Sequence, residues 1–433
     1  MRHALTFDRC PQSFKARETL DMNHRPSATR SRLAALLLSF ALALLWLRPV
    51  AAQTWVPNET QASPQPDMID PEFDWSTGRI AWNDCCGSLW VATVDPATGL
   101  IVPSSGKGVL VDPDSMNFQD AQKTKNGPAW AFAAGGSIIL YQKYAGRHTE
   151  GNSRLGAAFP MSPTRSCTYV SADGNWCAGN LEPELTREAP YGSWIDNDPS
   201  PFMTYVDNRG NHYWRYVNDP NSEQPIADFP PSNYPIRLPM CPDPTVPGIR
   251  SVIYPVVIDN VQQVVQRDLN TGVVTQLTFD AGTKYEMYEW CAPEFNNELI
   301  FFTIVNNNEL RVYRNLPDAH GNRTWTVIYD QFAPPRNQIF EPHPVIYNGR
   351  SYINMAMQVP PNIFRSQIWI SNIDASAPIF KRITPTTPLM TRTDPKWLVT
   401  RRGLLIYYNE LQPGCRDPSC SAGFWFADPG LPN

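Results

Sequence analysis

Residues 70–75 read Asp70-Pro71-Glu72-Phe73-Asp74-Trp75, and a short strand-like run, Ile80-Ala81-Trp82, follows them. A proline-led segment followed by such a run returns at four further places along the chain. A period of about 50 residues built from short strands is typical of a β-propeller, in which each repeat forms one blade. The sequence therefore predicts an all-β protein with this fold. The four further segments begin with Gly127-Pro128, Ala292-Pro293, Glu341-Pro342 and Asp394-Pro395.

The spacing of these segments also predicts the number of blades. The gap between Pro128 and Pro293 spans about three periods, so two more blades are expected within it. One is expected to start near Cys167-Thr168 and the other near Leu238-Pro239-Met240. This gives seven blades, with six as the alternative. Residues 145–235 hold long insertions rich in Pro, Asn, Asp and Ser, and the count is least constrained there.

The two ends of the chain are expected to meet in the last blade. The chain ends at Asn433, a few residues after the strand-like run Phe424-Trp425-Phe426, so this blade lacks an outer strand. We expect residues 53–69 to supply that strand and close the ring, which removes an exposed sheet edge. A disordered N-terminal segment is the alternative. The propeller itself is expected to comprise residues 70–433.

The N-terminus has the features of a secretory signal peptide. An apolar run over residues 34–47 follows Arg30 and Arg32 and precedes Val50-Ala51-Ala52. A basic flank, a short apolar core and small residues at the cleavage site define such a signal, here residues 1–52. The run is shorter than the ~20 residues that a membrane-spanning helix needs, and an uncleaved anchor is the alternative. The long leader suggests that Met22 is the true start. We expect a periplasmic or secreted protein.

The charge balance excludes several classes of partner. The chain holds 36 Lys and Arg against 41 Asp and Glu; eight basic and three acidic residues belong to the leader, which leaves 28 and 38 in the mature chain. No basic run or patch is present, which argues against a nucleic-acid partner. No second apolar segment reaches membrane-spanning length, so no membrane span is expected after cleavage. No phosphate loop or dinucleotide fingerprint occurs, and no cofactor is predicted. The oligomeric state stays open.

The cysteines agree with export. An even number of cysteines in an exported protein indicates disulfides. Cys241 and Cys291 each lie near the start of a blade, so they are expected to bridge adjacent blades. Cys167 and Cys177 flank a hairpin-like segment that they are expected to staple. The eight cysteines of the mature chain are Cys85, Cys86, Cys167, Cys177, Cys241, Cys291, Cys415 and Cys420.

The remaining four cysteines leave alternatives open. Cys85-Cys86 and the pair Cys415 and Cys420 fall in the same loop of the first and last repeats, which a closed ring makes neighbours. They either cross-link those blades, or Cys85 and Cys86 form a vicinal disulfide. A four-sulfur zinc site is the third alternative. Oxidising surroundings and the poor ligand geometry of adjacent cysteines disfavour it, and no metal is predicted.

Several segments resemble the repeats of TolB-like, or WD40-like, β-propellers. Residues 267–280, from Arg267-Asp268-Leu269 to Thr278-Phe279-Asp280, carry the Asp-x-x-x-Gly turn and Leu-Thr ending of those repeats. Asp95-Pro96-Ala97-Thr98-Gly99 and the Asp-Pro segments at 70 and 394 match as well. The resemblance is at the level of repeats and implies the fold. No separate N-terminal α/β domain of the TolB kind is visible, which argues against a TolB-like translocation role.

Candidate functional residues lie where the first strand of each blade begins, because ligands of propellers usually approach the loops there. Glu341-Pro342-His343 is the most unusual of these places, since a histidine beside a carboxylate can shuttle protons. Asp70, Glu341 and Asp394 are candidates for the carboxylate pair of a glycosidase. A hydrogen-bonded histidine and repeat-specific aspartates are the alternative. The residues at these places are Asp70, Asn126, Arg165, Glu289, Glu341, His343, Arg392 and Asp394.

Two functions from different classes remain. The leading one is a binding platform that presents its loop face to a protein or a glycan. The alternative is a carbohydrate-active hydrolase or lyase that uses Glu341, His343, Asp70 and Asp394 in the propeller channel. Catalysis requires carboxylates, or a histidine and a carboxylate, that converge on one point. A platform requires an exposed apolar or aromatic patch.

Overall fold

The computed structural model describes a single compact unit within residues 57–433. The described residues are 59–65, 68–84, 87–103, 108–115, 127–144, 153–181, 187–230, 236–359, 362–385, 390–412 and 421–432. The expected signal peptide and the alternative start at Met22 lie outside these residues. No helix in the described part of the chain has the length and apolar character needed to cross a bilayer.

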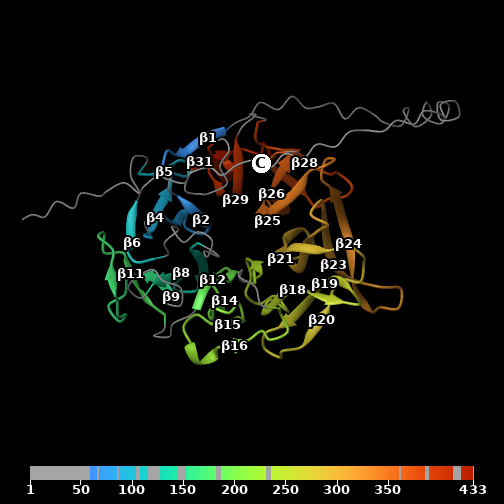
Figure 1. Cartoon of the computed structure of the whole chain (residues 1–433), viewed down its shortest axis with the longest axis horizontal. Coiled ribbons are helices and arrows are strands. Elements are labelled where there is room, and N and C mark those ends of the chain that lie inside the picture. The colour runs from blue at the N-terminus through green and yellow to red at the C-terminus, as the bar shows by residue number, and fades with distance from the viewer. Residues whose placement is uncertain are drawn as a thin grey trace, which may run out of the picture. The chain divides into compact units, whose positions relative to one another are not determined.

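The strands form an all-β propeller whose sheets surround a central axis (Figure 1). The innermost strands of the complete blades are β2 (Ile69–Asp74), β7 (Ala129–Ala133), β12 (Arg187–Gly192), β21 (Lys284–Ala292), β25 (Gln338–Tyr347) and β29 (Thr391–Thr400), and the short strand β17 (Met240–Cys241) lies beside β21 in the same sheet. The second strands are β3 (Arg79–Asn83), β8 (Gly136–Tyr144), β14 (Phe202–Asp207), β22 (Glu298–Val305), β26 (Arg350–Val359) and β30 (Gly403–Leu411), while β18 (Ser251–Ile258) begins a separate sheet.

Two further layers of strands complete the sheets. The third strands are β4 (Leu89–Val94), β9 (Ser153–Pro160), β15 (His212–Tyr216), β19 (Val261–Asp268), β23 (Glu309–Pro317), β27 (Asn362–Asn372) and β31 (Ser421–Ala427). The outer strands are β1 (Glu59–Ser63), β5 (Ile101–Val102), β6 (Val109–Asp112), β10 (Tyr169–Val170), β11 (Trp176–Asn180), β16 (Gln224–Pro225), β20 (Val274–Gln276), β24 (Arg323–Phe332) and β28 (Phe380–Arg382). The connections include the short strand β13 (Trp194–Ile195) and the 3₁₀ turns η2 (Pro220–Ser222) and η3 (Pro293–Phe295).

Six of these sheets hold at least four strands each and are complete blades. A further sheet, β18-β19-β20, holds three strands. The short strand β17 precedes it in sequence, but it pairs in parallel with β21 of the following blade and with β13. The expected all-β propeller is thus confirmed; in the described part of the chain it has six complete blades, the alternative to the expected seven, and its least regular part lies around β17.

The N-terminal strand β1 closes the ring, as predicted. It pairs antiparallel with β31, so that Glu59 lies opposite Ala427. A buried ion-pair network holds the strand in place. The Arg392 guanidinium donates to Glu59 at 3.1 Å and lies 3.1 Å from a Glu410 carboxylate oxygen. The last blade therefore combines both ends of the described chain.

Five innermost strands share one irregularity, a β-bulge near their start. The bulged residue has a positive φ between 46° and 55°, which non-glycine residues rarely adopt. In four strands a proline follows, because the bulge leaves this position without a ladder hydrogen bond to donate. The repeated Asp-Pro and Glu-Pro dipeptides thus mark a bulge. The five bulged residues are Asp70, Ala189, Glu286, Glu341 and Asp394.

Two expected blade starts were misplaced. Cys167 lies in the connection to β10, an outer strand, and the third blade begins at β12 instead. Ala292-Pro293 lies at the end of β21, where Pro293 starts a 3₁₀ turn. The bulge of that strand is at Glu286, which Met287 follows. The fixed φ of proline suits the first residue of a 3₁₀ turn as well as the start of a strand. Pro293 therefore marks a turn here, and the sequence alone does not separate the two cases.

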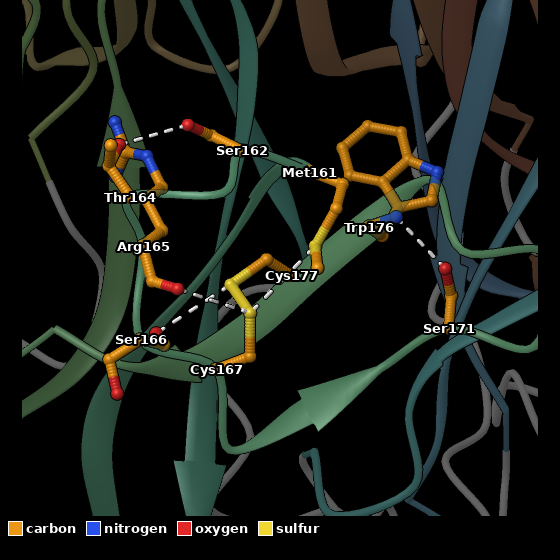
Figure 2. Close-up of a disulfide and its surroundings, with 9 residues drawn as sticks. All are labelled: Met161, Ser162, Thr164, Arg165, Ser166, Cys167, Ser171, Trp176 and Cys177. Carbon is orange, nitrogen blue, oxygen red and sulfur yellow. Dashed lines mark hydrogen bonds between the residues drawn. A yellow bond between two sulfur atoms is a disulfide. The ribbon is translucent and has the colours of Figure 1, made fainter.

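Two disulfides follow the predicted pairing. Cys167–Cys177 joins the ends of the segment that leads into β10 and β11, beside Met161 and Trp176 (Figure 2). Cys241–Cys291 joins β17 to β21, across 50 residues of sequence. The remaining candidates, Cys85, Cys86, Cys415 and Cys420, lie outside the described residues.

Close packing of adjacent innermost strands makes one glycine indispensable. A Cβ atom at Gly192 of β12 would lie 2.3 Å from the Trp130 carbonyl oxygen of β7. Gly192→Ala is therefore expected to lower the free energy of unfolding by about 1–3 kcal/mol, the usual cost of overpacking. Denaturant unfolding measures this. Gly135→Ala is the matched control, because a Cβ atom there meets nothing within 4 Å; equal effects of both substitutions would contradict the prediction.

Candidate functional site

The channel holds a charged cluster near the face where the innermost strands begin, here called the mouth face. Lys396 of β29 lies at its centre and is almost fully buried. Its ammonium group bonds to Glu72 and lies 3.0 Å from an Asp394 oxygen and 4.0 Å from an Asp70 oxygen. Three carboxylates therefore converge on one cation, and two of them are the predicted candidates Asp70 and Asp394.

The bulged carboxylates also connect neighbouring blades. An Asp70 oxygen accepts a hydrogen bond from the Gly127 amide of the next blade. A Glu341 oxygen accepts one from the Asp394 amide at 2.5 Å. Because each acid satisfies a backbone donor of the blade beside it, the bulges act as staples between blades. These bonds give the predicted candidates Asp70 and Glu341 a structural role, and their catalytic role stays a prediction.

Arg237 brings a second cation into the mouth of the channel. It belongs to the connection before β17, and its guanidinium lies 3.1 Å from a Glu286 carboxylate oxygen and donates to the Pro342 carbonyl at 3.1 Å. The positive charge of Arg237 thus bridges two blades. Five carboxylates face two cations in this region, those of Asp70, Glu72, Glu286, Glu341 and Asp394.

A second ring of side chains follows the bulged residues along the innermost strands, at the positions where regular strand pairing resumes after each bulge. Its members are two residues beyond the bulged positions. The hydroxyl groups of two of them, Tyr191 and Tyr288, lie 2.8 Å apart. His343 is buried beside Tyr288 at a ring separation of 6.2 Å. This inner ring consists of Glu72, Tyr191, Tyr288, His343 and Lys396.

Aromatic side chains fill the channel below the inner ring. Trp75 stacks on Phe132 at 4.4 Å and on Trp397 at 5.3 Å, and Trp194 meets it edge-on at 5.0 Å. The Trp75 indole donates to Asp196 at 2.9 Å, which fixes the stack. The cavity left between this plug and the inner ring measures about 10 Å³, room for about one water molecule.

Burial dominates the electrostatics of the cluster. It raises the pKa of Glu72 from 4.5 to about 7, while Lys396 opposes that rise. Burial and the neighbouring acids likewise raise the pKa of Asp394, and burial raises that of Glu341. The pKa of His343 is lowered by burial and by the two nearby cations, so its imidazole is neutral. A carboxyl poised near neutrality is suited to proton transfer.

The raised pKa of Glu72 predicts a pH dependence of stability. The folded state favours the protonated carboxyl more than the unfolded state does, so stability falls as the pH rises through the folded pKa. Between about pH 5 and pH 8 the free energy of unfolding should fall by about 2–3 kcal/mol through this group. Thermal unfolding across this range measures the slope.

Glu72→Gln should flatten that slope, because glutamine does not titrate. Glu298→Gln is the control, since Glu298 pairs with Arg314 on the outside of a blade. An unchanged slope in Glu72→Gln would show that the pH dependence arises elsewhere.

The mouth face carries four exposed apolar side chains at its loops and strand ends. They are Val257, Phe279, Tyr285 and Phe332, of which Val257 and Phe279 are 73% and 76% exposed. Val257 precedes the β18–β19 turn, Phe279 lies in the connection to β21, and Phe332 ends β24. Backbone hydrogen bonds join the loops beneath, from Asn306 to Thr283 and from Ala333 to Asn308. We call this set the mouth-face patch.

A larger cleft lies between the third complete blade and the three-stranded sheet. It measures about 450 Å³ and is bordered by Trp214, Ser222, Gln224, Arg267, Leu269, Asn270, Thr271 and Gly272. One aromatic ring among amide, hydroxyl and guanidinium groups is a lining that suits a polar ligand such as a sugar. No carboxylate is part of that lining, so the cleft lacks an acid pair for glycoside hydrolysis.

The other predicted positions do not join the channel cluster. Arg165 lies over the Phe159 ring of β9, and Arg392 belongs to the network that holds β1. Glu289 accepts hydrogen bonds from Ser251 and Gln266 between two blades. Asn126 lies outside the described residues. Among the residues that the structure describes, no three His, Cys, Asp or Glu side chains gather as a metal site.

Sequence reasoning missed Glu72, Lys396, Arg237 and Glu286. A usable signal for the first two exists, because both stand two residues after an Asp-Pro aspartate, as His343 stands two residues after Glu341. A bulge places that position toward the channel in every strand that has one. Arg237 belongs to a long connection without a repeat, so no pattern indicates its place.

Comparisons with known proteins support only the general fold. No protein-family model and no curated protein sequence matches the chain. TolB from Acinetobacter baumannii is 14% identical, covers 69% of this chain and 78% of its own, and has a TM-score of 0.36. The Cps50 (Swd1) β-propeller domain from Myceliophthora thermophila is 7% identical, with 86% and 98% covered and a TM-score of 0.46.

A third similar structure is the catalytic domain of a GH62 α-L-arabinofuranosidase from Coprinopsis cinerea. It is 12% identical, covers 69% of this chain and 89% of its own, and has a TM-score of 0.33. These similarities are at low identity, and with TM-scores below 0.5 they carry no further argument about this chain. Likeness at this level concerns architecture and carries no activity from those proteins to this chain.

Proposed function

We propose that this protein is an exported binding protein that presents its mouth face to a protein or glycan partner. The observation that carries the proposal is the combination of a filled channel with an exposed apolar patch. The pocket between the inner ring and the aromatic plug measures about 10 Å³, too little for a sugar ring or a peptide side chain. Clustered exposed apolar side chains such as Phe279 and Phe332 mark interaction sites more often than chance.

Three further observations support this function. The loops under the mouth-face patch are tied together by hydrogen bonds, so the patch is preorganised and loses little entropy on binding. Three of the four patch residues are aromatic, and aromatic residues anchor many interfaces. The two disulfides, Cys167–Cys177 and Cys241–Cys291, fit an oxidising compartment such as the periplasm or the cell exterior.

Site-specific photo-crosslinking tests the proposal. A photo-reactive amino acid is placed at Phe279 in the organism that encodes the protein, and crosslinked products are identified by mass spectrometry. The matched control carries it at Val273, which is 60% exposed on the turn between β19 and β20, away from the mouth face. A product formed from position 279 and lost in Phe332→Ser supports the proposal. Equal products from both positions would overturn the proposal. The absence of products from both positions would also overturn it, if a glycan array does not retain the protein either.

The second candidate is a carbohydrate-active hydrolase or lyase with its site in the channel. The observation that favours it is the convergence of Asp70, Glu72 and Asp394 on Lys396, with the Glu72 pKa near neutrality. The predicted candidates Glu341 and His343 lie in the same region. Lys396 neutralises part of this cluster, and the aromatic plug restricts substrate access, so we rank catalysis second.

A polysaccharide panel separates the two functions. Mature protein from Gln53 onward is incubated with neutral and acidic polysaccharides, with and without divalent metal, and reducing ends and unsaturated products are measured. The binding function predicts no release. Release that is abolished by Glu341→Gln or His343→Ala, in variants that keep the wild-type melting temperature, would establish the channel as an active site.

We also propose that β17 and the sheet β18-β19-β20 together act as a seventh blade. β17 stands before β18 at the place of an innermost strand, and Met240 lies opposite Trp290 of β21. Its two residues are too few to span the sheet, and the Cys241–Cys291 disulfide replaces part of the missing pairing. Hydrogen exchange should show the weakest protection of all innermost strands at β17.

A further inference from the structure

The outer edge of the blade built on β21 differs from every other described edge. Its outermost strand, β24, has ten residues and pairs along its length with β23. The other outer strands are shorter: β1 has five residues and β6 four, and β5, β10, β16, β20 and β28 have only two or three each. β24 ends its sheet and lies on the outside of the ring (Figure 1). A strand in this position offers a row of backbone donors and acceptors to another strand.

The sequence of β24 suits pairing. It reads Arg-Thr-Trp-Thr-Val-Ile-Tyr-Asp-Gln-Phe over residues 323–332, and β-branched and aromatic residues favour extended structure. The strand contains no lysine and no proline, two residues that often protect sheet edges. Trp325 packs on Phe301 of its own sheet at 5.0 Å, and the Tyr329 hydroxyl lies 2.9 Å from that of Ser371 in β27 of the neighbouring blade, so the strand is held in place from both sides.

The two charges of β24 are opposite and lie near its two ends. The Arg323 side chain is 53% exposed; its guanidinium donates to the Asn315 carbonyl at 2.6 Å and lies 3.6 Å from a Glu298 carboxylate oxygen, which leaves most of its five N–H donors free. Asp330 is exposed, and its carboxylate makes no hydrogen bond or ion pair with any described residue. An antiparallel copy of the same strand brings such charges together, because each end then faces the opposite end.

We propose that β24 pairs antiparallel with β24 of a second copy of this chain. A two-fold axis that pairs Thr326 with Thr326 of the other copy places Arg323 of each copy beside Asp330 of the other, in an isologous contact. The bulge at Ile328 permits this register, because it puts Arg323 and Asp330 on the same face of the sheet, opposite Pro317 and Arg311 of β23. The charge complementarity of the strand with itself selects a second copy as the occupant.

The resulting dimer is weak and depends on concentration. Stable protein–protein interfaces bury about 1,200–2,000 Å² of surface, and a single strand pair buries less. We therefore expect a low affinity of self-association. The mouth-face patch stays largely free, because only Phe332 belongs to both surfaces. The inference does not rest on the proposed binding function, and either can fail alone.

Sedimentation velocity over a concentration series tests the proposal with a charge exchange. In a homodimer of Arg323→Asp or of Asp330→Arg, both contacts bring like charges together. The affinity of self-association of each variant alone should therefore fall at least about tenfold below that of wild type. An equimolar mixture of the two variants should restore association, because both contacts of the heterodimer are then complementary. Arg209→Asp is the matched control, since Arg209 is exposed on a turn far from β24 in the sequence.

Thermal unfolding of each variant confirms that it folds. Association that falls in both single variants, stays in Arg209→Asp and returns in the mixture supports the proposal. A wild-type chain that is monomeric over the whole series overturns it, and so does a mixture that stays monomeric. Association of wild type that neither substitution weakens assigns the dimer to another surface and overturns it as well.

Discussion

Replacing Lys396 by methionine should destabilise the protein by about 3–5 kcal/mol, the cost of leaving buried carboxylates without their cation. Methionine fills a similar volume, so the loss reports charge rather than packing. Glu72, Asp394 and Asp70 would face one another in a largely buried site. Chemical denaturation at neutral pH measures the free energy of unfolding.

Two features identify the charge as the cause. The deficit of Lys396→Met should shrink as the pH falls, because protonation removes the repulsion among the acids. Addition of Glu72→Gln should recover part of the loss, so the two substitutions are non-additive. Lys381→Met is the control, because no ion pair of Lys381 exists among the described residues. A loss that is independent of pH would show that packing decides it.

Removing the Cys241–Cys291 disulfide by alanine substitution of both cysteines should cost about 4 kcal/mol, from the loop-closure entropy of its 50-residue loop. The same change at Cys167 and Cys177, which enclose only ten residues, should cost about 2.5 kcal/mol. The longer bridge also holds β17, which has few other ladder bonds.

Calorimetry of the two double variants compares them directly. Both cysteines of the longer bridge are fully buried, so alanine leaves small cavities that add to its cost. Hydrogen exchange should show that the loss at Cys241–Cys291 exposes β17 before the rest of the ring. A larger effect at the ten-residue bridge would contradict the loop-length argument.

The regular part of the ring was predictable because it repeats. Asp70-Pro71, Glu341-Pro342 and Asp394-Pro395 mark bulges at equivalent places, and the spacing of Cys241 and Cys291 equals one repeat. The blade on β12 escaped prediction because its bulge has Ala189 in place of an acid. The blade on β21 was shifted because Met287 replaces the proline.

The candidate site was predictable only in part. The sequence places Asp70, Glu341 and Asp394 at one end of the channel through the repeat. It does not indicate that a bulge turns the second following residue inward, so Glu72 and Lys396 were missed. The mouth-face patch was missed for a different reason. Phe279 lies in a connection, and Phe332 at a strand end, where no periodicity separates buried from exposed positions.

The closure of the ring by β1 sets the order in which the molecule can form. β1 is among the first segments of the fold to leave the ribosome, yet its partner β31 is among the last; the hydrogen bond from Tyr408 to Glu59 spans 349 residues. Contacts of such separation form late, because the loop they close is long. A nascent chain therefore keeps β1 unpaired until β31 has been synthesised. In any product truncated before β31, the last sheet holds only β29 and β30, and β1 has no strand to pair with.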